Sequence, residues 1–166
     1  MAIPVWGWLV AGALALVALA GCDEKRIQKL EEGLSTEADV RREFGEPATV
    51  YDQADGSRIL DYPRQPEGQR NYMITIGPDG RMSALRQVLT PANFAKIQPG
   101  MGPDEVQRML GRPAKKQTFS LKRETVWDWR YAEGQKAREF SVTFDADMRV
   151  VATDMHDDPK VTHGPL

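Results

Sequence analysis

The sequence contains many carboxylates, but no constellation of nucleophilic and acid–base side chains typical of an active site. The chain of 166 residues has one cysteine, Cys22, and two histidines, His156 and His163, which both lie near its end. No GxSxG motif is present, so the strand–turn–helix site of a serine hydrolase is not indicated. Because the single cysteine has another use, described below, no thiol nucleophile remains. We therefore predict that the protein is not an enzyme and needs no cofactor.

A metal site is the next chemistry to consider. The stretch Thr153-Asp154-Met155-His156-Asp157-Asp158 offers carboxylates and an imidazole. It lacks a sustained ligand spacing such as HExxH, in which a helix places two histidines on one face. We predict that residues 155–166 form a flexible, solvated tail, and that no metal is bound.

Cys22 lies where the sequence changes abruptly from apolar to charged. Residues 1–21 contain no charged side chain, and Asp23-Glu24-Lys25-Arg26 follow the cysteine. The Ala/Leu-rich run LVAGALALVALA, ending in small residues, is typical of a signal peptide, although no Lys or Arg precedes it. The alternative is an uncleaved transmembrane helix, because about 20 apolar residues can span a bilayer.

The four residues Leu19-Ala20-Gly21-Cys22 resemble the lipobox of bacterial lipoproteins. The resemblance implies cleavage before Cys22, a diacylglyceryl group on its sulfur and acylation of its new amine. Two or more acyl chains give stable attachment, at about 0.8 kcal/mol per buried methylene. Asp23 directly after the cysteine resembles a signal for retention in the inner membrane of enteric bacteria. With no second cysteine, the exported chain has no internal disulfide.

The balance of charge argues against a nucleic-acid partner. The chain has 22 Lys and Arg against 24 Asp and Glu, a net charge of −2. A near-neutral, mixed surface provides neither the field that attracts nucleic acid nor a polybasic membrane patch.

A repeat organises the rest of the chain. The segment LEEGLSTEADVRREFGEP (30–47) matches IQPGMGPDEVQRMLGRP (97–113), and YMITIGPDGRMSA (72–84) matches FSVTFDADMRVVA (140–152). The paired positions of the helical motif are Gly33 and Gly100, Val40 and Val106, Phe44 and Leu110, Gly45 and Gly111, and Pro47 and Pro113. We predict a signal peptide over 1–21 and tandem repeats over 22–90 and 91–154.

Each repeat reads as two helices followed by four strands. Ile27, Leu30 and Leu34 form one apolar stripe, which predicts a short amphipathic helix at the start of the first repeat. The next helices have start signals at Ser35 or Thr36 and at Gly102-Pro103. Gly45 and Gly111 are placed to end these helices in the left-handed conformation.

After each pair of helices the apolar residues recur at every second position, which predicts strands. They are expected over 49–53, 58–62, 72–76 and 81–88, and again over 116–120, 125–131, 139–144 and 149–153. The predicted fold is α+β: a tandem of two ααββββ units, each an antiparallel sheet with helices on one face.

One strand carries the residues that best fit partner binding. Alternation places Trp127, Trp129 and Tyr131 on one face, where they either pack beneath the helices or line an exposed binding surface. If helices cover them, the polar residues of the opposite face are the contact surface: Asp128, Arg130, Ser141 and Thr143. The Pro- and Gly-containing loop 62–70 is either a partner contact or a simple connection.

The motif of the second repeat resembles the BamE family, small outer-membrane lipoproteins that assist β-barrel assembly. The matching residues are Gly100, Val106, Leu110, Gly111, Pro113, Trp127, Tyr131, Val142 and Phe144. The tandem also resembles the architecture of β-lactamase inhibitory protein. The best-known BamE members have one unit and this chain has two.

These resemblances imply a non-catalytic envelope lipoprotein. We expect it to be anchored in the outer membrane through Cys22, facing the periplasm, and to bind a protein partner such as a β-barrel assembly subunit. Asp23 favours the inner membrane instead. The alternative function is an inhibitor-like lipoprotein that blocks an envelope enzyme with a loop.

Overall fold

The computed structural model describes residues 18–162, with side chains over residues 23–160. One sheet contains β1 (Thr49–Asp52), β2 (Arg58–Pro63), β3 (Asn71–Ile76) and β4 (Met82–Gln87). The other contains β5 (Lys115–Phe119), β6 (Glu124–Glu133), β7 (Lys136–Phe144) and β8 (Val150–Asp157). The helices are α1 (Ala18–Ile27), α2 (Glu37–Phe44), α3 (Pro91–Phe94), α4 (Pro103–Leu110) and α5 (Pro159–Thr162).

The two sheets repeat the same simple topology. Each is antiparallel, and its strands lie side by side in the order in which they occur in the chain. Short hairpins connect them, so neighbours in sequence are neighbours in space. The predicted α+β class and the arrangement in two units are confirmed.

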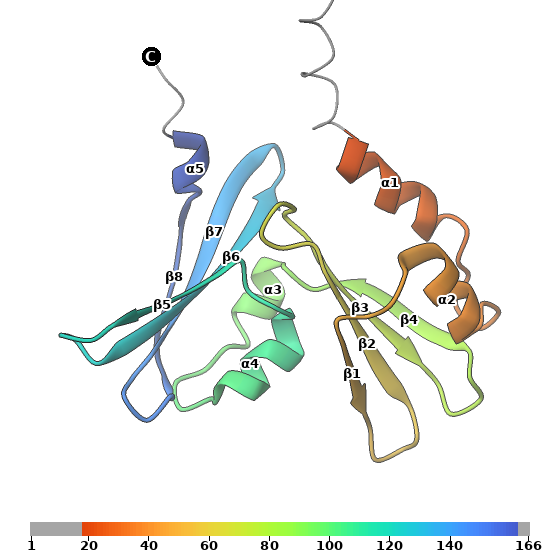
Figure 1. Ribbon diagram of the computed structural model, residues 1–166, viewed down its shortest axis with the longest axis horizontal. Helices are drawn as coiled ribbons and strands as arrows, with labels where there is room; N and C mark the ends of the chain where they lie inside the picture. Colours follow the sequence, from red (N-terminus) through yellow and green to blue (C-terminus); the bar gives the residue numbers. More distant parts are fainter. Residues whose placement is uncertain (1–17, 163–166) are drawn as a thin grey trace, which may run out of the picture.

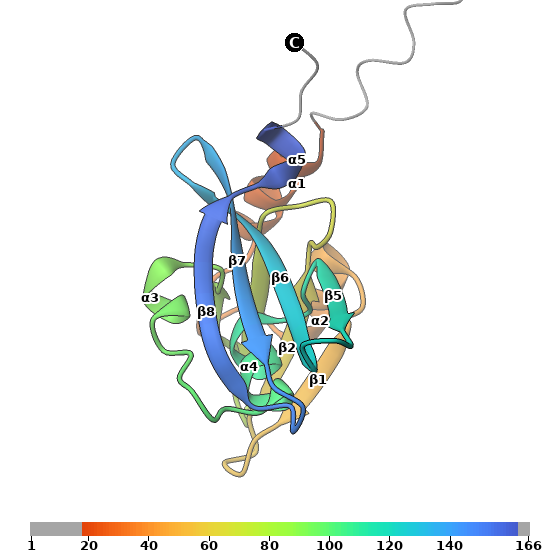
Figure 2. The same ribbon diagram turned by 90° about the vertical axis from the view of Figure 1, so that its left-hand side faces the viewer.

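Sheets and helices alternate across the molecule in Figure 1. From left to right, the layers are the sheet β5–β8, the helices α3 and α4, the sheet β1–β4, and the helices α1 and α2. Figure 2 shows the sheet β5–β8 face-on, with no helix in front of its strands. One sheet face of the second unit is therefore open.

The helices α2 and α4 begin where the sequence predicts. The Thr36 side chain accepts a hydrogen bond from the Asp39 backbone N–H, and the Asp39 carboxylate accepts one from the Thr36 N–H at 2.9 Å. In α4, Pro103 occupies the first turn and the Glu105 carboxylate accepts the Gly102 N–H at 2.8 Å. Both arrangements satisfy backbone donors that an α-helix leaves unpaired at its start.

Glycines end both helices, with one difference from the prediction. Gly45 has φ 83° and ψ −162°, and Gly111 has φ 74° and ψ −173°. The positive φ was expected, but ψ is extended rather than left-handed helical. This region of backbone space is almost restricted to glycine. It turns the chain directly towards Pro47 or Pro113 and the first strand of each sheet.

The first glycine of the repeat motif ties the helical part to the last strand of each sheet. Gly33 N–H donates to the Met82 carbonyl, and Gly100 N–H donates to the Val150 carbonyl, both at 2.8 Å. Both glycines have positive φ, 82° and 89°. The same contact in both units is a structural reason for the repeated glycine.

Two expectations about the chain ends are corrected. α1 ends at Ile27. Leu30 follows a turn and Leu34 lies in one, so the predicted apolar stripe is not on one helix. Leu34 is 60% exposed. At the other end, β8 continues through Asp157, because Arg138 to Ser141 of β7 pair with Asp157 to Asp154. Residues 155–157 are thus part of the sheet and not of a tail.

The predicted signal peptide lies mostly outside the described residues. Residues 1–17 are not described, and Cys22 lies in α1 with its side chain outside the described ones. Within residues 18–162, no helix has the length and hydropathy needed to cross a membrane.

Each unit has its own core. The first is built from Val40 and Phe44 of α2 packed on Leu60, Tyr62, Tyr72, Ile74, Ile76 and Met82. The second is built around Val106 and Leu110 of α4, packed on aromatic and aliphatic side chains of β6, β7 and β8. Val40 and Val106, equivalent in the repeat, are both fully buried.

Polar side chains of the first unit join the two units. The Asn71 amide donates to the carbonyls of Leu110 at 2.7 Å and Arg112 at 3.1 Å, just after α4. Asn71 is fully buried. The Arg112 guanidinium returns a bond to the Gln65 carbonyl at 3.1 Å. The junction is therefore specific, because Asn71, Gln65 and Arg112 each have a defined partner in the other unit.

Candidate functional site

The predicted aromatic residues are core residues. Trp127 is 5% exposed, and Trp129 and Tyr131 are fully buried beneath α3 and α4. The Trp129 indole N–H donates to the Gly111 carbonyl at 3.0 Å. The packing alternative therefore holds, and these three side chains have almost no surface to offer a partner in this conformation.

The opposite face of the same strands is the open one. Strand register places Asp128 beside Ser141 and Val126 beside Thr143, on the face away from the buried tryptophans. This is the face turned to the viewer in Figure 2. Ser141 and Thr143 are half-buried, as expected for the middle of a solvated sheet. Asp128 is 7% exposed because its neighbours pack against it.

Two residues that sequence reasoning missed join this face. β8 pairs His156 with Glu139 of β7, so both side chains lie next to Ser141. His156 had been predicted in a flexible tail, but strand pairing positions it. The pairing depends on β8 extending to Asp157, past the predicted strand end at 153. We call Asp128, Glu139, Ser141, Thr143 and His156 the open-face cluster.

Hydrogen bonds connect the open-face cluster. The Ser141 hydroxyl lies 2.7 Å from Asp128 Oδ1, to which it donates, and 3.2 Å from His156 Nε2. His156 Nδ1 lies 3.1 Å from the Asp157 carbonyl oxygen, and Nε2 lies 3.7 Å from Glu139 Oε1. Which ring nitrogen donates in these contacts depends on the tautomer of His156.

Burial raises the pKa of the Glu139 carboxyl above its usual range, and the Asp128 carboxylate raises it further. His156 opposes this shift. Two acids and one imidazole thus share a small area, which makes the cluster sensitive to the charge of whatever approaches it.

The cluster contains serine, histidine and aspartate, but not in the geometry of a catalytic triad. In a triad the carboxylate orients the imidazole and the serine hydroxyl donates to it. Here the Asp128 carboxylate contacts the serine, and His156 Nδ1 faces a backbone carbonyl. Within the described residues, no group of three or more His, Cys, Asp or Glu side chains is arranged to hold a metal ion.

Arg130, the remaining predicted residue, is held by the protein itself. Its guanidinium donates to Asp158 Oδ2 at 2.6 Å and to the Pro66 carbonyl at 2.9 Å. Asp158 is fully buried. The Gln65 side chain donates to the Arg130 carbonyl at 2.7 Å and accepts the Arg130 N–H at 3.2 Å.

These bonds show what loop 62–70 does. β5 pairs with β6 only as far as Asp128, so the backbone of Arg130 lies on an unpaired strand edge. The Gln65 amide takes the place of the missing strand and closes that edge. The loop is thus a structural joint between the units, and Arg130 is one of its partners.

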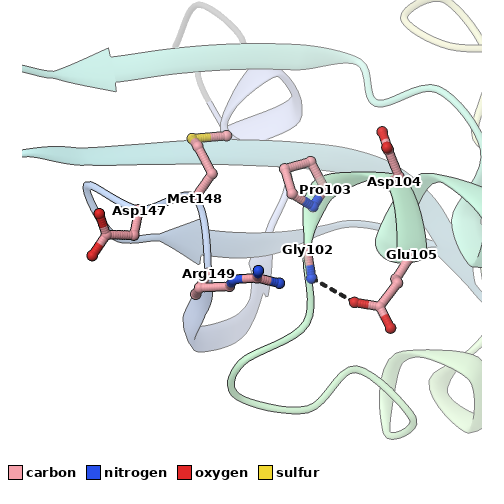
Figure 3. Close-up of a pocket in the computed structure, with 7 residues that line it drawn as sticks. All are labelled: Gly102, Pro103, Asp104, Glu105, Asp147, Met148 and Arg149. Atoms are coloured by element: carbon pink, nitrogen blue, oxygen red, sulfur yellow. Dashed lines mark hydrogen bonds between the residues drawn. The ribbon is translucent and has the colours of Figure 1, made fainter.

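A shallow pocket of about 340 Å³ lies at the start of α4, between Gly102–Glu105 and Asp147–Arg149 (Figure 3). The Gly102 N–H points to the Glu105 carboxylate, so the helix N-terminus is already satisfied from within. Asp104, Glu105 and Asp147 give the pocket three carboxylates against one guanidinium, Arg149. Such a lining does not suit an anionic ligand.

A second surface feature was also missed from sequence. Leu121, at the tip of the β5–β6 hairpin, has 104% relative exposure, and Phe119 beside it is 38% exposed. Lys122 and Arg123 complete the turn, with φ 54° at Arg123. The equivalent turn of the first unit, Ala54-Asp55-Gly56-Ser57, is polar, so the repeat fold does not require a leucine there.

A comparison with known protein families finds a match for the second unit. A family model described as the outer membrane protein assembly factor BamE domain matches residues 87–154. The second repeat is therefore similar to the BamE domain. The match begins at Gln87, at the end of β4, and includes α3, α4, β5, β6, β7 and most of β8. The first unit lies before the match and shares the strand order and the glycine contacts of the matched unit.

Three solved structures show partial similarity. The osmotically inducible lipoprotein OsmE is 20% identical, covering 45% of this chain and 79% of its own, with TM-score 0.38. YjgB, a DUF4309 family protein of Bacillus subtilis, is 22% identical over 79% of this chain and 84% of its own, with TM-score 0.32. A Streptococcus mutans protein described as a β-lactamase inhibitor is 11% identical over 82% and 96%, with TM-score 0.36.

With TM-scores below 0.5, these similarities establish no shared function. A search of curated proteins finds no match to this chain. The similarity to the BamE family therefore rests on the match over the second unit.

Proposed function

We propose that this protein is a cell-envelope lipoprotein that acts as a non-catalytic adaptor in outer-membrane protein assembly. The observation that carries the proposal is a BamE-like unit whose sheet has one helix-covered face and one open, hydrogen-bonded face. Acylated Cys22 would anchor it, and the open-face cluster would contact a protein partner.

The chemistry of the open face supports binding rather than catalysis. The Asp128 carboxylate and Ser141 hydroxyl are held by hydrogen bonds, so little side-chain entropy is lost when a partner docks. Thr143 and Ser141 present hydroxyls, while Glu139 and His156 present charge that selects complementary groups. The two shallow pockets described by the structure, one at the start of α4 and one beside α1, lie elsewhere.

The direct test is co-purification from detergent-solubilised envelopes of the native host. We expect the tagged wild-type protein to recover β-barrel assembly subunits, and Thr143→Arg, a large group in the middle of the open face, to lose them. Ser83→Arg, an exposed position on β4, is the matched control. Equal recovery with all three proteins would exclude the open face as the contact surface.

Anchoring is tested separately. Cys22→Ser should release the protein from membranes, whereas retention at its original apparent size would indicate an uncleaved helix. Asp23→Ser tests the membrane address: if the retention rule operates in this host, the protein should move from the inner to the outer membrane.

One observation favours the second candidate, an inhibitor-like role. The exposed Leu121 tip is a side chain that could enter a pocket of an envelope enzyme. In the same co-purification, recovery of a soluble hydrolase that is lost with Leu121→Ser would support this role and contradict the adaptor role.

A further inference from the structure

The residue that follows the predicted lipid-attachment site is held against the folded body. Both oxygens of the Asp23 carboxylate accept bonds from the Arg64 guanidinium, at 2.9 and 3.0 Å. Arg26 adds a contact to Asp23 at 3.4 Å. Asp23 is only 6% exposed, and the Arg64 side chain is 25% exposed. A bidentate, partly buried arginine–carboxylate pair is much more strongly fixed than an ordinary surface pair.

Arg64 is itself well positioned. Its backbone N–H donates to the Asn71 side chain at 3.0 Å, and its guanidinium lies 5.4 Å from the Phe44 ring centre, over the core of the first unit. A second ion pair, Arg70 to Glu24 at 3.4 Å, joins the next residue of α1 to the same loop. The part of α1 that remains after the predicted cleavage, residues 22–27, is thus fastened to loop 62–70, the joint between the units.

The length of one peptide unit limits how far the lipid-bearing Cys22 can lie from the folded body. Adjacent Cα atoms lie about 3.8 Å apart, so Cys22 cannot move far from the body while Asp23 is held. A lipid on Cys22 would have no flexible tether. The body must therefore sit directly on the membrane, with the end that carries α1 and loop 62–70 facing the headgroups.

From this we infer that the protein docks on the lipid surface through that end in one orientation, with its strands standing away from the membrane. The inference rests on the proposed lipidation of Cys22. Figure 1 shows that the β6–β7 turn and α5 lie at the same end as α1, while the β1–β2 and β7–β8 turns lie at the other.

The strand lengths give the expected scale. β6 has ten residues between the β5–β6 tip and the β6–β7 turn, and so spans about 33 Å at about 3.3 Å per residue. The β6–β7 turn would touch the headgroups, and the Leu121 tip would lie far from them. The open-face cluster would then stand sideways to the membrane, where a neighbouring membrane protein can reach it.

The charges on the end that carries α1 and loop 62–70 indicate which interactions fix the orientation of the protein on the membrane. At this end exposed Lys25, Arg70, Lys136 and Lys160 are balanced by exposed Glu24, Glu67, Glu133 and Asp157, so headgroup attraction is weak. The orientation should come from the buried Asp23–Arg64 pair and the lipid, and should therefore persist in high salt, which screens exposed charges far more than buried ones.

The test uses the full-length, lipidated protein in nanodiscs with quencher-labelled headgroups. Acylation takes up the Cys22 thiol, so one introduced cysteine can be labelled uniquely. We expect a fluorophore at Lys136→Cys to be quenched several-fold more than one at Ser120→Cys, in low and in high salt. Equal quenching at the two positions would overturn the inference.

Two release variants complete the test. Asp23→Asn and Arg64→Ala should each reduce the quenching at position 136 towards the level at position 120. Each variant removes one partner of the ion pair and so releases the anchor segment from the folded body. Unchanged quenching in both would also overturn the inference. Intact mass reports separately whether Cys22 is acylated: an unmodified cysteine refutes the lipoprotein proposal itself, whereas an acylated protein without orientation refutes only the docking.

Discussion

Asp61 is a buried acid in an unfavourable place, and its replacement by asparagine gives the sharpest test of the junction between units. The side chain is fully buried, and neither carboxylate oxygen has a hydrogen-bond partner in the described structure. It lies against the second unit, since a Cβ added to Gly111 would come within 2.9 Å of its Oδ1. Burial raises the pKa of Asp61 from 3.8 to about 6, and the nearby Arg112 offsets only part of the shift.

The magnitude follows from linkage. A shift of about two units corresponds to about 3 kcal/mol of free energy of unfolding at neutral pH. Because the folded pKa is raised, the folded state binds the proton more tightly than the unfolded one. The contribution of Asp61 to stability is therefore greatest below the unfolded value of 3.8 and is lost as the pH rises through about 6.

Asp61→Asn removes the charge while keeping the shape of the side chain. We expect a gain of about 1–3 kcal/mol at about pH 8, less than the full 3 kcal/mol because a buried amide also needs partners. Near pH 4 the variant and the wild type should be almost equally stable. Urea unfolding at the two pH values measures both differences, with the exposed turn variant Asp147→Asn as the matched control.

The reasoning would be refuted if Asp61→Asn were no more stable than wild type at high pH. Such a result would mean that Arg112 or solvent compensates the buried carboxylate fully. A gain of equal size at both pH values would refute the titration argument alone, because a packing effect does not depend on protonation.

Three further predictions concern the repeat and its junction. Gly111→Ala should destabilise the protein clearly more than Gly45→Ala in thermal unfolding. At both positions alanine would adopt a strained backbone conformation, at a cost of about 1–3 kcal/mol. Only at Gly111 does the new Cβ also meet a neighbour, Asp61 or Asn71 within about 3 Å. Equal losses would show that the junction yields freely. Gln65→Ala should destabilise by about 1–3 kcal/mol, because the Arg130 backbone loses both bonds at the strand edge, and faster amide exchange at Arg130 is the expected readout. Trp129→Ala should cost about 3–5 kcal/mol as a core truncation; lost partner binding at unchanged melting temperature would instead make it a contact residue.

The repeat itself was readable because its signals are local. Gly33 and Gly100 are spaced from their helices and strands in the same way, and the change from helical to alternating period occurs within a few residues of Gly45 and Gly111. Helix caps depend on neighbours three residues away, as Thr36 and Asp39 show. Such features predict the α+β class and the two four-stranded units without tertiary information.

The site depended on contacts that the sequence does not display. Alternation placed Trp129 and Asp128 on opposite faces, but only the position of α4 decided which face is buried. His156 joined Ser141 because β8 pairs with β7 beyond the expected end of the repeat, and the extent of pairing is set by both strands together. Arg130 was predicted as a partner contact, yet Gln65, distant in sequence, takes up its backbone.

The sequence by itself therefore determined the repeated units and the predicted anchor, since each is encoded in short runs with a fixed period or order. Only the tertiary structure decided how the units meet and which side chains remain free. Those outcomes depend on burial and on hydrogen bonds between residues far apart in the chain. Asp23 illustrates both: its place beside Cys22 is written in the sequence, but its fastening to Arg64 exists only in the fold.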